Sequence, residues 1–136
     1  MATSTQMREK GNLLLVEDDL AIREAMTHVL ETENYEVSSA RSSREAFSRF
    51  KEKRIDVVLL DLSLGDEEGW LVFLKFKELR PDLPIIVTSG RTDELTNSHA
   101  SKASAVLEKP FDVVVLLGLL DQIKGASLTS APASRV

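Results

Sequence analysis

The sequence of 136 residues contains no cysteine, and this absence excludes several kinds of site. Without a thiol the chain can form no disulfide, no zinc–thiolate centre and no cysteine nucleophile, which agrees with a reducing cytosol. No apolar run is long enough to span a membrane, and the first residues, MATSTQMREKGN, lack the apolar core of a signal peptide. We therefore expect a cytoplasmic protein that does not enter a membrane.

Positive charge is also scarce. Seventeen Lys and Arg residues stand against 22 Asp and Glu residues, so the net charge is −5 and direct binding to nucleic acid is not expected. Neither G-x-G-x-x-G nor a P-loop is present, which leaves nucleotide binding without support. The length is sufficient for one hydrophobic core. We expect an N-terminal extension at residues 1–11, one domain at 12–124, and a small, polar, disordered tail or linker start at 125–136.

Short apolar runs alternate five times with amphipathic segments. The amphipathic segments predict helices, one of which follows a capping box at Ser42; the fourth, at 93–100, is weak and polar, and the fifth, at 113–123, is strongly apolar. The alternation predicts parallel βαβ units, and hence an α/β fold with a doubly wound five-stranded sheet covered on both faces. The apolar runs place the five strands at residues 13–16, 35–39, 57–60, 85–88 and 105–107.

The residues that follow the predicted strands carry the chemistry. In open α/β sheets, ligands bind beyond the carboxyl ends of the strands. If the strand order is 2-1-3-4-5, Asp18 and Asp61 end neighbouring strands about 4.8 Å apart, and their charges repel unless a cation intervenes. The side chains that should meet at this edge are Glu17 and Asp18 after the first strand, Asp61 after the third, Thr88 at the end of the fourth and Lys109 after the fifth.

A hard divalent ion such as Mg²⁺ would relieve this repulsion. It takes one or two carboxylates, keeps several waters and leaves positions for phosphate oxygens. Lys109 would add a second positive charge and Thr88 a hydroxyl donor. Together these groups are suited to phosphoryl transfer onto a carboxylate, which forms an acyl phosphate. A phosphoryl group that is present only part of the time, bonded to Lys109 and Thr88, would provide a switch.

Four segments, NLLLVEDD, VVLLDLSLGDEEG, PIIVTSG and LEKPF, together resemble the receiver domain of two-component response regulators. They occur in the order and spacing of that family, and the resemblance covers residues 12–124. It implies a flavodoxin-like sheet with strand order 2-1-3-4-5, Mg²⁺ as the cofactor, and phosphorylation by a histidine kinase or a histidine phosphotransfer protein.

The resemblance also implies what the strand-end residues do. The domain would catalyse only its own phosphorylation and slow dephosphorylation, so we do not expect an enzyme with separate substrates. The Lys109–Pro110 peptide bond would be cis. The implied roles are phosphoacceptor and metal ligand for Asp61, direct Mg²⁺ ligand for Asp18, Mg²⁺ ligand through water for Glu17, backbone-carbonyl ligand for Ser63, switch hydroxyl for Thr88 and phosphate-binding lysine for Lys109.

Three positions depart from the family pattern. Gly65 stands where proline is usual and should loosen the turn after Asp61. Val106 stands where an aromatic side chain usually moves with the switch hydroxyl, and it is too small and stiff for that task. Lys102 stands where glycine is common. The chemistry should survive these changes, whereas the route of the signal out of the site is in doubt. We expect the acidic turn GDEEG, residues 65–69, to be merely solvated.

The fifth predicted helix is too apolar for one buried face. A helix that covers a sheet buries a stripe, so some apolar residues between Val113 and Ile123 should form an exposed patch. The resemblance implies that the fourth helix, the fifth strand and the fifth helix form an interaction surface. We expect this surface to bind a downstream protein effector, and it is also a candidate homodimer interface.

Two alternatives to a stand-alone phosphorylated receiver stay open: a regulatory fragment of a longer transcription factor, and a receiver-like binding module that works without phosphorylation. A Mg²⁺-dependent phosphatase with an aspartyl nucleophile fits less well, because Ser63 stands where such enzymes need a second acid. A flavodoxin-like electron carrier also fits poorly, because Glu17, Asp18 and Asp19 would repel a phosphate at the first strand end.

Overall fold

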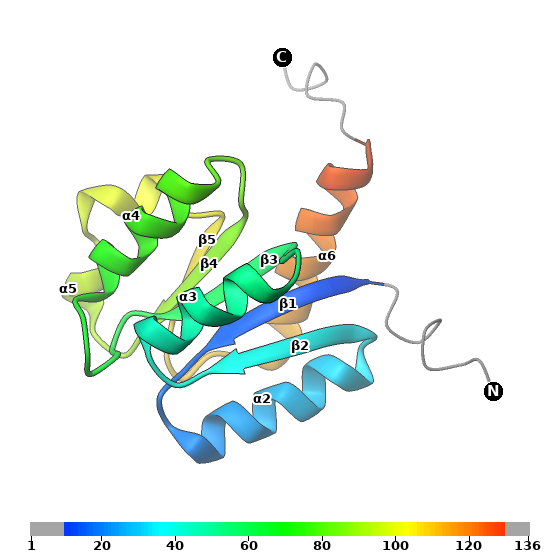
Figure 1. The fold of residues 1–136 in the computed structure, drawn as a ribbon, viewed down its shortest axis with the longest axis horizontal. Helices are drawn as coiled ribbons and strands as arrows, with labels where there is room; N and C mark the ends of the chain where they lie inside the picture. Colours follow the sequence, from blue (N-terminus) through cyan, green and yellow to red (C-terminus); the bar gives the residue numbers. More distant parts are fainter. Residues whose placement is uncertain (1–9, 130–136) are drawn as a thin grey trace.

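A five-stranded parallel sheet lies between two layers of helices in the computed structural model, which describes residues 10–129 (Figure 1). The strand order is β2-β1-β3-β4-β5, which confirms the predicted doubly wound topology. All neighbouring strands are parallel. The strands are β1 (Gly11–Val16), β2 (Tyr35–Ala40), β3 (Val57–Asp61), β4 (Ile85–Ser89) and β5 (Ala105–Glu108).

Helices follow each strand, with two corrections to the predicted ranges. The fourth predicted helix is divided, because the Asn97 side chain accepts a hydrogen bond from the amide of His99 and starts a separate turn. The last helix continues to Thr129, so the disordered tail predicted from residue 125 is wrong for residues 125–129. The helices are α2 (Leu20–Thr32), α3 (Ser43–Glu52), α4 (Gly69–Leu79), α5 (Thr92–Leu95), the 3-10 helix η1 (Ser98–Lys102) and α6 (Val113–Thr129).

Strand β1 and helix α6 are the first and last elements of the described residues. Strand β1 starts at Gly11, one residue before the predicted start at 12. Residues 1–9 of the predicted extension and residues 130–136 of the predicted tail lie outside the described residues. The composition of residues 125–129 suggested disorder, yet adding residues to the end of an existing helix needs no new nucleation step, which accounts for the continuation of α6. Within the described part of the chain, no helix is both long and apolar enough to cross a bilayer.

Polar side chains begin the helices. Asp19 Oδ1 accepts the amide of Ile22 at 3.0 Å and caps α2. Ser42 Oγ accepts the amide of Glu45 at 3.1 Å, which confirms the predicted cap of α3. Glu68 Oε1 accepts the amide of Leu71 at 3.1 Å and caps α4. Since Glu68 belongs to the acidic turn, the expectation that this turn is merely solvated is wrong.

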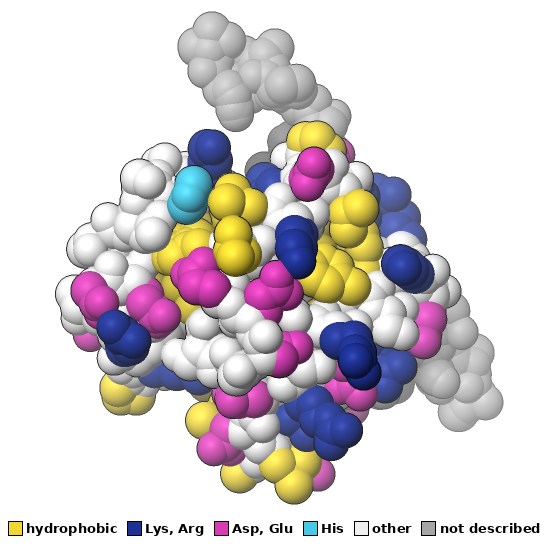
Figure 2. Space-filling view, turned by 60° about the vertical axis from the view of Figure 1, so that its left-hand side comes forward, with side chains coloured by type: hydrophobic (Ala, Val, Ile, Leu, Met, Phe, Trp, Pro, Cys, Tyr) yellow, Lys and Arg dark blue, Asp and Glu magenta, His cyan; other side chains and the backbone are white. Residues whose placement is uncertain are grey.

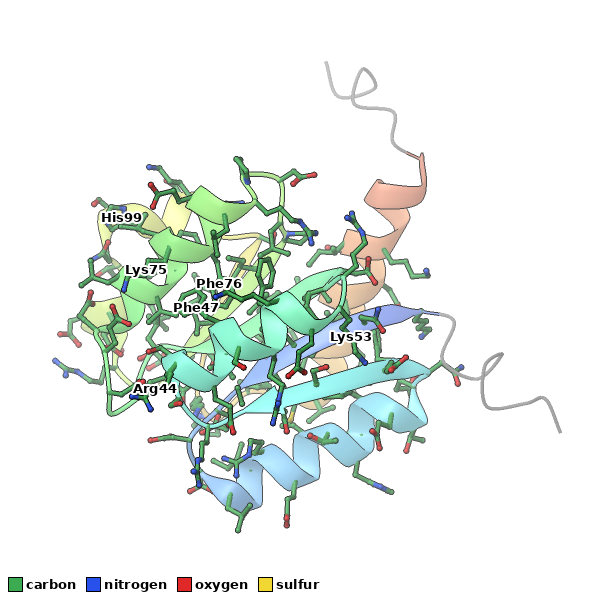
Figure 3. All side chains as sticks on the ribbon, in the orientation of Figure 1. Arg44, Phe47, Lys53, Lys75, Phe76 and His99 are labelled. Atoms are coloured by element: carbon green, nitrogen blue, oxygen red, sulfur yellow. The ribbon has the colours of Figure 1, made fainter. Side chains whose placement is uncertain are left out.

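The two faces of the sheet bury separate apolar clusters. Along β1, Leu14 and Val16 face a cluster that contains α3 and α4, whereas Leu13 and Leu15 face a cluster that contains α2 and α6. This period of two is the pattern expected of a strand with both faces covered. Between α3 and α4, Phe47 and Phe76 stack with ring centroids 4.5 Å apart (Figure 3). The helices thereby hold the central strands in a fixed register.

Helix α4 begins in direct contact with the backbone that follows the third strand. A Cβ atom at Gly69 would lie 2.5 Å from both the Cα and the carbonyl oxygen of Leu62, which is closer than non-bonded atoms can approach. Leu62 is itself buried and directly follows Asp61. Only glycine therefore lets α4 start at this position without moving the residue beside Asp61.

We expect Gly69→Ala to destabilise the domain by about 1–3 kcal/mol, because the new methyl group must displace the Leu62 backbone. Urea unfolding measures this loss. Gly118→Ala is the matched control: Gly118 lies in α6 with open space around its Cβ position, so the same change should stabilise the domain by about 0.5–1 kcal/mol. Equal effects of the two substitutions would show that the close contact at Gly69 is unimportant.

Candidate functional site

The carboxyl ends of four strands bring the predicted side chains to one edge of the sheet. Strand β1 aligns Val16 with Leu60 of β3, so the residues that follow these positions are neighbours. Asp61 is aligned with Thr88 of β4. Figure 2 brings the left-hand side of Figure 1 forward and shows acidic side chains across its middle, interspersed with Lys and Arg side chains. The edge therefore brings together residues that are far apart in the sequence.

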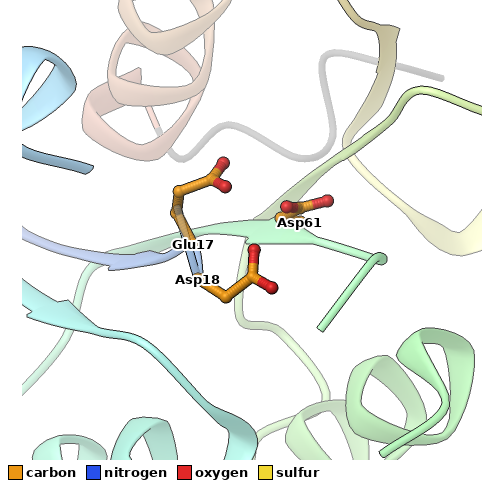
Figure 4. A group of neighbouring side chains, drawn as sticks. All are labelled: Glu17, Asp18 and Asp61. Atoms are coloured by element: carbon orange, nitrogen blue, oxygen red, sulfur yellow. The ribbon is translucent and has the colours of Figure 1, made fainter. Parts of the chain in front are cut away.

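Three carboxylates converge at this edge. Glu17, Asp18 and Asp61 each place an oxygen so that the three oxygens lie within 4.8 Å of one another (Figure 4). Glu17 and Asp61 are buried, and Asp18 is exposed. Hard divalent cations prefer oxygen ligands of this kind and keep water on their open side. The donor set thus suits a divalent metal that is reached from the solvent next to Asp18.

Lys109 joins two of the three acids. Its Nζ atom lies 2.9 Å from Glu17 Oε1 and 3.0 Å from Asp61 Oδ2. Burial lowers the pKa of Lys109, but its hydrogen bonds to Glu17 and Asp61 outweigh this effect and raise the pKa above its ordinary value. The ammonium group therefore stays charged and neutralises part of the buried negative charge.

The Glu17 carboxyl has a pKa above its ordinary value. Burial raises this pKa, the Lys109 hydrogen bond lowers it, the charge of Asp61 raises it again, and the net direction is upward. Burial is the largest of these causes. A cation bound between Glu17, Asp18 and Asp61 would favour the charged form of Glu17 and lower this pKa.

The two oxygens of Asp61 have different partners. Oδ2 faces Lys109, and Oδ1 accepts the amide of Ser63 at 3.0 Å. The amide of Leu62 donates to the carbonyl of Thr88 at 2.9 Å, which ties the turn to β4. The structure therefore places Ser63 and Thr88 beside Asp61, as expected, while the Ser63 carbonyl as a metal ligand stays a prediction.

Arg23 is a contributor that the sequence did not reveal. Its Nη1 atom donates to the carbonyl of Glu17 at 2.8 Å and lies 3.3 Å from that of Asp18. The guanidinium thus fixes the backbone that carries two of the acids. No role for Arg23 was expected from the sequence. The available signal was that Arg23 lies one helical turn after the capping Asp19, so its side chain can reach back to the residues before the helix.

Two further expectations concern the Lys109–Pro110 bond and the exposed apolar side chains near this edge. The Lys109–Pro110 bond is cis, as predicted. Helix α6 leaves Val114 and Val115 exposed, at 72% and 50%, and Val106 on β5 is 37% exposed. Helix α6 thus leaves apolar side chains exposed, as expected, while their joining into one patch stays a prediction. Val106 lies at the edge of the sheet, without an aromatic ring that could move with Thr88.

Comparisons with known proteins agree with this geometry. Residues 13–121 match the family model described as "Response regulator receiver domain". The transcriptional regulatory protein KdpE of Staphylococcus aureus is 33% identical over 106 residues, which are 76% of this chain and 46% of KdpE. The chain spans about half, or less, of the length of the curated relatives that it matches.

Solved structures share the fold. A CheY-like receiver domain protein from Methanospirillum hungatei JF-1 has a TM-score of 0.81 and 27% identity, and the match covers 89% of this chain and 98% of that one. TrrA from Thermotoga maritima, solved in complex with Mg(2+)-BeF, has a TM-score of 0.77 and 24% identity over 83% of this chain and 98% of that one. Because the family model matches most of the sequence, the chain belongs to the response regulator receiver domain family.

Proposed function

We propose that this receiver domain is a switch that accepts a phosphoryl group on Asp61 in the presence of Mg²⁺. The observation that carries the proposal is the buried Asp61 carboxylate, 3.0 Å from the Lys109 ammonium and grouped with the oxygens of Glu17 and Asp18. An isolated buried carboxylate is costly, so this arrangement is explained best by a reaction that uses it.

The residues have distinct tasks in such a transfer. A carboxylate oxygen of Asp61 attacks the phosphorus atom, and an oxygen–phosphorus bond forms as the bond to the donor's nitrogen breaks. Lys109 neutralises negative charge on the phosphoryl oxygens, and the Thr88 hydroxyl donates a hydrogen bond to one of them. Asp18, Glu17 and the Ser63 carbonyl would hold Mg²⁺, which supplies further neutralisation when it is bound.

The phosphodonor would be a histidine kinase or a histidine phosphotransfer protein in the cytoplasm. Receiver domains of response regulators interact with kinases and effector domains, which supports this choice. The domain would catalyse its own phosphorylation and slow dephosphorylation and act on no separate substrate. The acidic edge favours Mg²⁺, and TrrA, a protein of the same fold, holds Mg(2+)-BeF in its solved structure.

The output surface would be formed by α5, β5 and α6. It exposes Val106, Val114 and Val115, and Thr92 Oγ1 of α5 donates to Glu108 Oε2 of β5 at 3.0 Å. Such an apolar patch suits a protein partner, either an effector or a second copy of the domain. The curated relatives include transcriptional regulators of which this chain matches half or less, which favours the alternative that it regulates a longer transcription factor.

Phosphorylation is tested first by intact-mass spectrometry. Wild type incubated with acetyl phosphate and Mg²⁺ should gain one phosphoryl group, and Asp61→Asn should gain none because the nucleophile is absent. A chelator should abolish the gain in wild type. If no adduct forms, a stable beryllofluoride complex would indicate rapid hydrolysis. Absence of both would contradict the proposal and leave a phosphorylation-independent binding module.

Removal of the bridging lysine tests the charge balance of the site. We expect Lys109→Ala to cost about 3 kcal/mol in urea unfolding, because Glu17 and Asp61 then remain buried without a counter-charge. Added Mg²⁺ should restore part of this stability. Lys53→Ala is the control: Lys53 pairs with Glu36 at 2.8 Å on the surface, so its loss should cost less than about 1 kcal/mol. Equal losses would show that the site carries no special electrostatic constraint.

Light scattering tests whether the exposed patch forms a homodimer. The mass of wild type with beryllofluoride should rise with protein concentration, and Val114→Glu should prevent the rise because it places a charge in the apolar contact. Val114 is exposed, so the substitution should leave the fold intact. A mass that stays monomeric at all concentrations, with and without beryllofluoride, would exclude the dimer and leave the effector as the partner.

A further inference from the structure

The turn between β3 and α4 is hydrogen-bonded to the start of α3. Asp66 accepts the amide of Ser43, the first residue of α3, at 3.1 Å and 3.0 Å to its two oxygens. The Ser43 hydroxyl lies 2.8 Å from Asp66 Oδ2, and the amide of Arg44 lies 3.4 Å from the same oxygen. A carboxylate that follows Asp61 by five residues thus caps a helix 22 to 23 positions earlier in the chain.

Glu67 strengthens this anchor. Its Oε1 atom lies 3.1 Å from the Ser43 hydroxyl, and its Oε2 atom pairs with Lys75 of α4 at 2.6 Å. Figure 3 shows Arg44 in the first turn of α3 and Lys75 on α4, on either side of this turn. Ser43 is only 4% exposed, so its hydroxyl depends on these two carboxylates for hydrogen bonds. Asp66 and Glu67 therefore link α3, the turn and α4.

The segment between Asp61 and this anchor is held at Leu62 and at the amide of Ser63, but among the described residues nothing constrains the backbone at Gly65. Leu62 and Leu64 are buried, but Ser63 and Gly65 are exposed, and a Cβ atom at Gly65 would meet nothing within 4 Å. Glycine allows many backbone conformations, and each residue that must be ordered costs about 1–2 kcal/mol of conformational entropy. If the turn is already ordered in the metal-free protein, the free energy of Mg²⁺ binding is not reduced by this entropy cost.

We propose that Asp66 is a positioning residue for the metal-binding turn, because its cap on α3 holds the backbone that presents the Ser63 carbonyl. The inference rests on the proposed function, since it takes the Ser63 carbonyl as a ligand of Mg²⁺. Family members usually have proline where Gly65 stands, and the proline ring restricts the turn. In this chain the hydrogen bonds of Asp66, one residue later, would restrict the turn instead.

The protonation state of Asp66 agrees with this role. Burial raises the pKa of its carboxyl, but the hydrogen bonds from Ser43 and Arg44 together lower the pKa more, so the net direction is downward. Asp66 is therefore a carboxylate at neutral pH. Its charge could also attract a cation without any positioning, and a test must separate these two effects.

Asp66→Ala and Asp66→Asn separate them. Asparagine carries no charge but keeps one oxygen that can accept the amides of Ser43 and Arg44, and its NH2 group can donate to the Ser43 hydroxyl. We expect Asp66→Ala to weaken Mg²⁺ binding by about tenfold in calorimetric titration, and Asp66→Asn to stay within about threefold of wild type. In the metal-free protein, hydrogen exchange of residues 62–68 should accelerate in Asp66→Ala and stay slow in Asp66→Asn. A loss in Asp66→Asn as large as in Asp66→Ala would overturn the inference, because charge would then be the cause.

Ser42→Ala is the matched control. Ser42 caps the same helix through the amide of Glu45 but does not touch the turn, so its loss should lower thermal stability and leave Mg²⁺ affinity unchanged. If Asp66→Ala folds poorly, Ser43→Ala is the substitute test. This change removes only the hydroxyl, so it should weaken Mg²⁺ binding by less than the tenfold expected for Asp66→Ala. Wild-type affinity in Asp66→Ala would overturn this inference alone. Absence of Mg²⁺ binding by wild type would overturn the proposed function and this inference together.

Discussion

The ammonium group of Lys109, between the carboxylates of Glu17 and Asp61, is the interaction on which the site depends. The three groups come from the ends of β5, β1 and β3, and the two acids are almost fully buried. Two buried carboxyl groups this close can both stay ionised only if a positive charge meets them, since otherwise one takes up a proton. The parallel sheet makes this contact possible, since it places the carboxyl ends of all its strands at one edge.

Much of the surrounding structure keeps the backbone at this edge in place. Arg23 holds the carbonyl of Glu17, and the amide of Ser63 fixes one oxygen of Asp61. Gly69 lets α4 pack directly on the residue after Asp61. On the far side of the turn, Asp66 is bound to the start of α3. Most of these contacts restrict the backbone, and the Ser63 amide restricts the Asp61 carboxylate itself, so the site is preorganised for an ion.

The acidic turn shows how residues of one charge can have separate functions. Asp66 caps α3, Glu67 pairs with Lys75, and Glu68 caps α4. As a run of acids the turn suggested a solvated surface. The assignment was wrong because the partners of Asp66 and Glu67 lie on α3 and on the second turn of α4, where composition gives no indication of them.

The strands, the cap at Ser42 and the side chains that follow each strand could be predicted from the sequence, and the family resemblance supplied the strand order. These features follow from local patterns, since apolar periodicity and capping depend on residues only a few positions apart. The contacts of Lys109, Arg23 and Asp66 became visible only in the tertiary structure. The same holds for the division between α5 and η1 and for the extension of α6 to Thr129. Lys109 and Glu17 are 92 positions apart, and no local pattern determines whether such groups meet. Their distance depends on strand register and helix packing over the whole domain.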